Sequence, residues 1–181
     1  GRHQVDITGL IGQYAHGNEP SHHMAYLYNY INKPWKSQER VAQILSEMYS
    51  NTPDGLSGNE DCGQMSSWYV LSAMGIYSVT PGLDYYTIGS PRLNKAIINL
   101  ENGNQFKIIA HGASKDNMYI KSALLNGKSF NRSYIYHSEI MNGGILEFEM
   151  SPEPNKLWAS LDSNLPISSI DEDKIVAVPY V

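Results

Sequence analysis

The hydrophobic positions follow a helical period in the first part of the chain. Met24, Leu27, Tyr28 and Ile31 recur at the spacing of one helical face. This pattern predicts a helix over residues 21–31 whose apolar stripe packs on the core.

Two further helices are predicted downstream. Within residues 35–49 an apolar stripe faces a polar one, which indicates an amphipathic outer helix. Residues 64–75 are apolar nearly all round, which indicates an inner helix buried on most sides. The stripe of the outer helix is Val41, Ile44, Leu45 and Met48, and its wet face is Gln38, Glu39, Arg40, Gln43 and Glu47.

After Pro81 the hydrophobic period becomes two. Apolar and polar residues alternate in short runs separated by turn residues, and Asn126-Gly127 is a strong hairpin signal. We therefore predict an α+β fold class with an antiparallel β-sheet or sandwich over residues 94–150. A loop at 151–166 and an edge strand at 175–180 would follow. The predicted domains are residues 1–82, which carry the site loops, and residues 83–181, which carry the sheet and a C-terminal tail.

Composition excludes several classes of function. With 13 Lys and Arg against 18 Asp and Glu, the chain has a net charge of -5 and no basic stripe, so no nucleic-acid partner is expected. Cys62 is the single cysteine and cannot form an intrachain disulfide. No apolar run approaches membrane-spanning length, so we expect no membrane-spanning segment. The chain begins without an initiator methionine, which we interpret as a fragment of a longer protein.

Two glycine-flanked polar clusters each stand before a helical segment. They are His16-Gly17-Asn18-Glu19-Pro20-Ser21-His22-His23 and Gly58-Asn59-Glu60-Asp61-Cys62-Gly63. A lone Asp at the start of a helix is commonly a cap. Several polar groups crowded at one loop-to-helix junction indicate a functional site instead.

The segments "GNEPSHHMAYLYNY" and "GNEDCGQMSSWYVLSAMGIYSVTPG" resemble the hallmark segments of glycoside hydrolase family 92, the calcium-dependent exo-acting alpha-mannosidases. The resemblance continues through "IGSPRLNKAIINLENG", "LNGKSFNRSYIYHSEIMNGGILEFEM" and "PNKLW" and covers most of the chain. It implies that the helices form part of an alpha/alpha toroid whose apolar inner wall this chain alone would leave open. It also implies the C-terminal part of an inverting enzyme that removes terminal, alpha-1,2-linked mannose from glycans. Such an enzyme would be secreted or periplasmic.

The resemblance also implies roles for individual residues. Asp61 matches the general base, and Glu60 is a weaker catalytic candidate. Asn59 stands where the family often has a second acid, and we assign it to substrate binding. Of the adjacent His22 and His23, we expect one to hydrogen-bond to the sugar or to the residues that contact it, and the other to pack; His22 is the one assigned to substrate binding. Asn18 and Glu19 match the calcium-site motif and offer the oxygen ligands that calcium prefers. The general acid is expected from the remaining N-terminal part of the enzyme.

Other interpretations remain open at this point. A zinc site built from the histidines and Cys62 fits no known ligand spacing. A non-catalytic carbohydrate-binding or structural β-sandwich module would expose a row of aromatic residues, for which Tyr134 and Tyr136 are candidates. A phosphorolytic enzyme would need clustered arginines, which the sequence lacks. His111 and His137 lie in strand-like segments and are interpreted as structural. Aromatic residues at helical spacing are expected mainly in the core: Tyr26, Tyr28, Tyr30, Trp68 and Tyr69.

Overall fold

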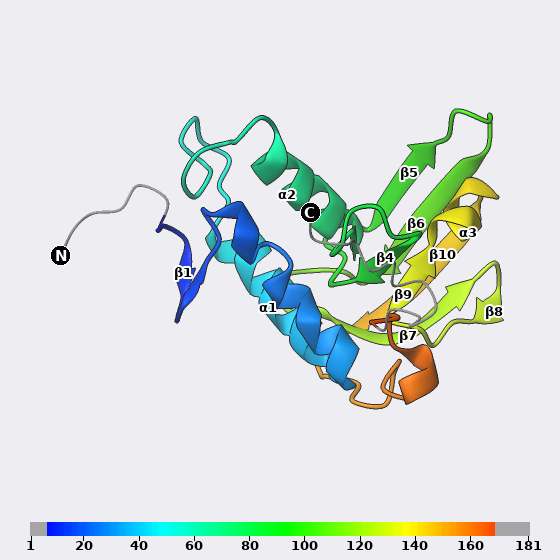
Figure 1. The fold of residues 1–181 in the computed structure, drawn as a ribbon. Coiled ribbons are helices and arrows are strands. Elements are labelled where there is room, and N and C mark those ends of the chain that lie inside the picture. The colour runs from blue at the N-terminus through cyan, green and yellow to red at the C-terminus, as the bar shows by residue number, and fades with distance from the viewer. Residues whose placement is uncertain (1–6, 169–181) are drawn as a thin grey trace, which may run out of the picture.

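The computed structural model describes residues 7–168, and these residues form a mixed fold of helices and sheets. Helices η2, α1 and α2 lie on one side of the molecule and the strands of the larger sheet on the other (Figure 1). The helices are η1 (Glu19–Ser21), η2 (Met24–Ile31), α1 (Pro34–Glu47), α2 (Gln64–Met74), α3 (His137–Met141) and η3 (Asp162–Asn164), of which η1 to η3 are 3₁₀ helices. The strands are β1 (Leu10–Ile11), β2 (Tyr14–Ala15), β3 (Ile76–Tyr77), β4 (Tyr85–Ile88), β5 (Lys95–Asn99), β6 (Gln105–His111), β7 (Tyr119–Leu125), β8 (Lys128–Ser129), β9 (Tyr134–Tyr136) and β10 (Gly144–Ser151). The predicted α+β class is confirmed, and β1 and β2 form a short antiparallel hairpin before the first helix.

The segment before α1 differs from its prediction. It forms 3₁₀ helices, and the predicted inner stripe is turned outward, with Met24 and Leu27 exposed. With three residues per turn, Tyr26 and Asn29 share one face, and that face is buried. Tyr26 shares a hydrogen bond with the Ser72 hydroxyl, and Asn29 Nδ2 donates to the carbonyl of residue 88. The buried face of η2 is therefore the one that carries Tyr26 and Asn29, and the predicted face was wrong.

Helices α1 and α2 form where the sequence predicts them, and the predicted apolar stripe of α1 is buried. Helix α1 contacts both η2 and β7 and is covered on two sides. Gln38, predicted on the wet face, is buried, and its Oε1 accepts a hydrogen bond from the Ile120 backbone N–H at 3.0 Å. Helix α2 buries Trp68 but exposes Tyr69 and Val70 on its other face. The predicted inner helix is therefore open on one side among the described residues.

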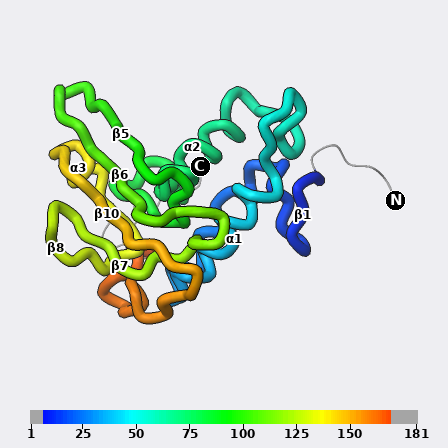
Figure 2. The backbone as a smooth tube through the Cα atoms, turned by 180° about the vertical axis from the view of Figure 1, so that it is seen from behind, coloured from blue at the N-terminus to red at the C-terminus, as the bar shows by residue number. Residues whose placement is uncertain are grey.

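The larger sheet has the strand order β5-β6-β10-β7-β8. Figure 2 shows these strands from behind. Strand β10 pairs antiparallel with β7 but parallel with β6, so the sheet is mixed and not wholly antiparallel as predicted. The parallel pair arises because β10 returns to the sheet after the chain has left it through β9 and α3. Strands β7 and β8 are joined by the predicted Asn126-Gly127 turn, whose two residues have the positive φ that this hairpin requires.

A second sheet has the order β3-β4-β9 and joins early and late segments of the chain. Helix α3 follows β9 and begins at His137, which was wrongly predicted in a strand. Ile88 and Ile135 of this sheet share one core with Phe106 and Phe148 of the larger sheet. The boundary between residues 82 and 83 stays a prediction. The strand predicted at 175–180 lies outside the described residues.

Candidate active site

The two polar clusters, far apart in the sequence, meet through their glycines. A Cβ built on Gly58 would lie 2.9 Å from the carbonyl oxygen of Gly17. A Cβ built on Gly17 would lie 3.0 Å from the carbonyl oxygen of Ser57 and 2.1 Å from Thr8 Oγ1. Real Cβ contacts are longer, so glycine is what lets the two backbones approach this closely. The loop that carries Asn18 and Glu19 (the first loop, residues 17–21) therefore lies against the segment that leads to Asp61.

A buried histidine stands at each end of the first loop. His16 accepts a hydrogen bond from the Tyr14 hydroxyl at Nδ1 (2.8 Å) and donates from Nε2 to the Tyr49 hydroxyl (2.6 Å). The Tyr49 hydroxyl in turn donates to the Met65 carbonyl in the first turn of α2 (3.2 Å). Burial, together with the nearby His22, lowers the pKa of His16 to about 3. A neutral ring with one donor and one acceptor matches these two partners.

His22 is also buried, at 1% exposure, and both of its ring nitrogens have protein partners. Nε2 donates to the His16 carbonyl (2.9 Å), which leaves Nδ1 to accept a hydrogen bond from the Gln64 side chain (3.2 Å). Burial lowers the pKa of His22, whereas the His16 hydrogen bond and the negative charges of Glu19 and Asp61 raise it. Both acids therefore lie close enough to act on one imidazole ring.

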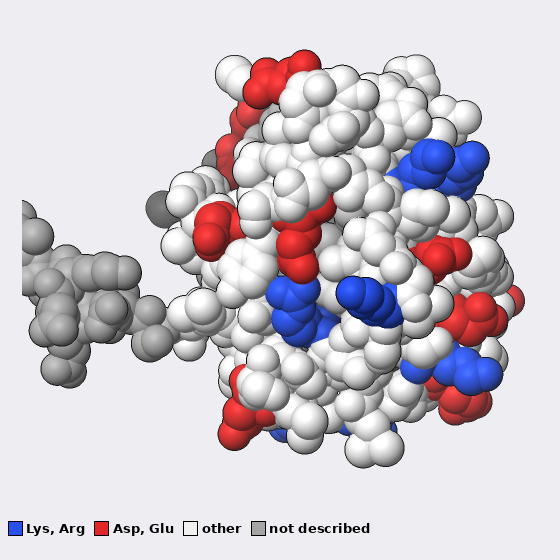
Figure 3. Space-filling view, turned by 90° about the vertical axis from the view of Figure 1, so that its right-hand side faces the viewer, with Lys and Arg blue, Asp and Glu red and all other residues white. Residues whose placement is uncertain are grey.

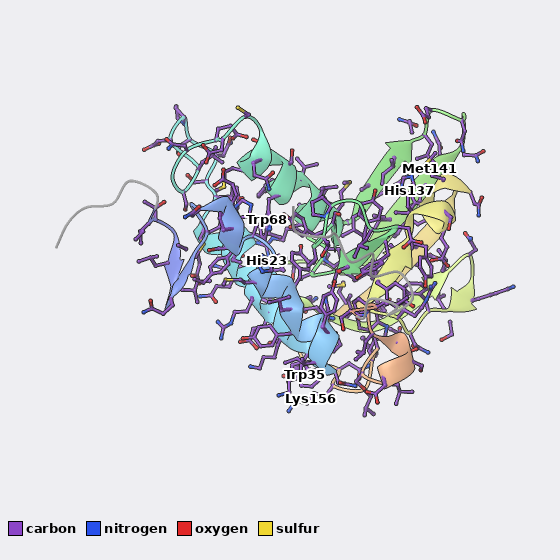
Figure 4. The ribbon with its side chains drawn as sticks, viewed as in Figure 1. His23, Trp35, Trp68, His137, Met141 and Lys156 are labelled. Carbon is purple, nitrogen blue, oxygen red and sulfur yellow. The ribbon has the colours of Figure 1, made fainter. Side chains whose placement is uncertain are left out.

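Trp68 completes the buried cluster from the α2 side. Its indole N–H donates to the His22 carbonyl (3.1 Å), and its ring meets the His16 ring edge-on with centroids 4.5 Å apart. Figure 4 shows Trp68 and His23 where α2 and the start of η2 come together. The interpretation of Trp68 as a core residue is confirmed, because it is fully buried.

Asp61 lies on a left-handed turn at the start of α2. Asp61, Cys62 and Gly63 have φ of 52°, 57° and 94°, which is uncommon for two consecutive residues other than glycine. The Glu60 carboxylate accepts hydrogen bonds from the backbone N–H and the hydroxyl of Ser66, at 3.1 and 2.9 Å. Glu60 thus caps α2, while the turn exposes Asp61 on the surface of the described residues. The Glu60 carboxylate therefore stabilises the first turn of α2.

The first loop and the turn bring oxygen donors together, but they do not form a complete metal cage. Among residues 7–168 no group of three or more His, Cys, Asp and Glu side chains is placed to hold a metal ion. Asn18 and Glu19 offer the amide and carboxylate oxygens that calcium binds. This donor set fits part of a calcium site that needs further ligands. Asn59 is exposed next to the turn.

Sequence reasoning missed three of the residues that hold this region together. Tyr14, Tyr49 and Gln64 bond to the two histidines or to α2, but nothing in their local pattern marks them. The repeated Gly-Asn-Glu, at Gly17 and again at Gly58, was the available signal that the two segments act together.

The glycosyl hydrolase family 92 catalytic domain matches residues 1–152 of this chain. The chain belongs to this family. A family 92 alpha-mannosidase from Bacteroides thetaiotaomicron superposes with a TM-score of 0.86 at 45% identity, covering 90% of this chain and 22% of that one. A family 92 inverting mannosidase from the same organism gives a TM-score of 0.82 at 43% identity, covering 87% of this chain and 21% of that one.

A relative described as an uncharacterized secreted glycosidase comes from Arthroderma benhamiae. It is 31% identical over 155 residues, which are 84% of this chain and 20% of that protein. This chain therefore spans about a fifth of the length of its family 92 relatives. No helix within residues 7–168 is long and apolar enough to cross a membrane. On the face in Figure 3, basic and acidic side chains are interspersed, so this face carries no continuous basic stripe.

Proposed function

We propose that this chain forms part of the catalytic domain of an inverting exo-alpha-mannosidase, with Asp61 as the general base. The observation that carries the proposal is the convergence of the first loop and the segment leading to the Asp61 turn, whose backbones meet at Gly17 and Gly58. The family 92 relatives described as an alpha-mannosidase and an inverting mannosidase support the same reaction.

In this reaction Asp61 accepts a proton from a water molecule as the water oxygen attacks the anomeric carbon. The bond from that carbon to the leaving oxygen breaks, and a general acid protonates the leaving oxygen. Base and acid in inverting enzymes stand about 6.5–9.5 Å apart, which leaves room for the water. We expect the acid to come from the remaining part of the enzyme. Asn59, beside the turn, would orient the water or the sugar.

We further propose that the enzyme depends on calcium, with Asn18 and Glu19 as part of its ligand set. When bound, calcium would supply a positive charge that attracts sugar hydroxyl oxygens. The first loop holds both residues on a short backbone segment closed at its ends by His16 and His22. The other ligands would come from outside the described residues.

The proposed substrate is a glycan with terminal, alpha-1,2-linked mannose, and we expect a secreted or periplasmic enzyme. A secreted relative supports the location. We also propose that the helices belong to an alpha/alpha toroid and the sheets to a β-sandwich. The remaining part of the enzyme would then pack against the exposed face of α2. A hollow of about 480 Å³ lies there, between the loop after α1 and a wall that includes Tyr69 and Val70.

The non-catalytic module is the weaker alternative. It predicts a row of exposed aromatic residues on a sheet face, but Tyr134 is buried and packs against Tyr85 and Tyr136. The Arg132 guanidinium also lies over the Tyr134 ring, at 5.2 Å from its centroid. This aromatic row is part of the packing of β9 and offers little ring surface to a sugar.

The test is the anomeric form of the first product. The complete enzyme should release beta-mannose from alpha-1,2-linked mannobiose, as followed by proton NMR before mutarotation. Release of alpha-mannose would exclude inversion, and absence of turnover in the presence of calcium would exclude the mannosidase proposal. This chain by itself should show no turnover, because we expect the remaining part of the enzyme to supply the general acid.

A further inference from the structure

His22 closes the first loop on itself. Its Nε2 donates to the carbonyl oxygen of His16, so the residues at the two ends of the loop are joined directly at 2.9 Å. The loop between them carries Asn18 and Glu19. A loop whose ends are joined in this way has fewer accessible conformations than an open one.

His22 also contacts α2 at two points. Its ring accepts a hydrogen bond from Gln64, and its carbonyl accepts one from Trp68. Residues four apart lie on the same face of an α-helix, one turn above the other. Two contacts at this spacing fix both the rotation and the axial position of α2 relative to the first loop.

Gln64 directly follows the left-handed turn of Asp61, Cys62 and Gly63. Its backbone N–H donates to the Asp61 carbonyl at 3.2 Å. A shift of the Gln64 side chain would therefore be transmitted to the Asp61 backbone. With both ring nitrogens engaged and 1% exposure, His22 has no nitrogen left to offer a sugar among the described contacts.

We propose that His22 is a positioning residue that acts through Gln64. It sets the separation between the first loop and the Asp61 turn, and it does not contact the substrate. This inference rests on the proposed function, and it replaces the substrate-binding role that the sequence predicts for His22.

The test compares Gln64→Ala, His22→Gln and the double variant in the complete enzyme. When the amide nitrogen of Gln at position 22 donates to the His16 carbonyl, its amide oxygen does not occupy the place of the His22 Nδ1 atom, which is the acceptor that Gln64 requires. We expect each single variant to lower kcat by about 10–100-fold, as misplacement of a reacting group by up to about 1 Å does. Mannose affinity, measured by calorimetry, should stay within about 3-fold. The double variant should be no worse than the more affected single variant, because both changes break one contact.

His23→Gln is the matched control, since it changes the adjacent histidine and should leave kcat and mannose affinity unchanged. Any one of three results would overturn the proposal. The first is an unchanged kcat in Gln64→Ala, and the second is additive losses of kcat in the double variant. The third is a mannose affinity that falls as much as kcat/KM in His22→Gln. If His22→Gln fails to fold, the kcat and mannose affinity of Gln64→Ala decide the question.

A crystal structure of Gln64→Ala separates this proposal from the proposed function. A displaced Asp61 turn would support the positioning role even if the wild-type enzyme hydrolyses no mannoside. A turn that stays in place would contradict it whatever the activity.

Discussion

Replacing Gly58 by alanine tests whether the approach of the two loops determines activity. The added Cβ would lie 2.9 Å from the Gly17 carbonyl oxygen and 3.2 Å from its Cα. Both atoms belong to backbone, so no side-chain rotation can relieve the contact. The two segments must move apart.

The structure sets the size of the effect. Alanine at the left-handed φ of +78° costs about 1–2 kcal/mol in folding free energy. The Cβ contact is also about 0.5 Å shorter than ordinary van der Waals contact, so the loops should separate by a few tenths of an ångström. A misplacement of 1 Å can lower a rate by about 100-fold, so we expect kcat to fall by about 10-fold.

Gly12→Ala is the matched control. Gly12 also has a left-handed φ of +60°, but a Cβ there would meet nothing within 4 Å. The control should therefore share the backbone cost without the contact. The assay is kcat for alpha-linked mannobiose in the complete enzyme, together with calorimetric unfolding of each variant. Equal kcat in Gly58→Ala and Gly12→Ala would refute the reasoning.

Three further predictions follow from the site and the fold. Asp61→Asn should lower kcat by at least about 100-fold, because general-base catalysis contributes about 10²–10⁴-fold, whereas Asn59→Ala should be milder. Near-normal hydrolysis by Asp61→Asn would make Glu60 the next candidate. Chelation should abolish hydrolysis and calcium should restore it, and Glu19→Gln should need a higher calcium concentration. Full activity in the presence of a chelator would show that Asn18 and Glu19 do not hold a required metal ion. Gln38→Ala should destabilise the fold by about 1–3 kcal/mol, since it leaves the buried Ile120 N–H without its acceptor. Gln43→Ala, on the more exposed face of α1, should change the free energy of unfolding by less than about 0.5 kcal/mol. Equal unfolding temperatures of the two variants would contradict this prediction.

The sequence by itself determined the elements whose signals are local. The apolar spacing predicted α1 and α2, the alternation predicted most strands of the larger sheet, and Asn126-Gly127 predicted its hairpin. These signals suffice because helix period, strand period and turn conformation depend on residues close together in the chain. The two polar clusters, at Gly17 and Gly58, were visible for the same reason.

Only the tertiary structure decided which faces are buried and how the site is held. The buried face of η2 depends on partners at Ser72 and Ile88, and the burial of Gln38 depends on Ile120. A polar side chain can be buried when a distant segment satisfies its hydrogen bonds. The residues next to it in the sequence do not show which distant segment that will be. The contact of His22 with Gln64 has the same origin: the two residues stand 42 positions apart, and only folding brings them within hydrogen-bond distance.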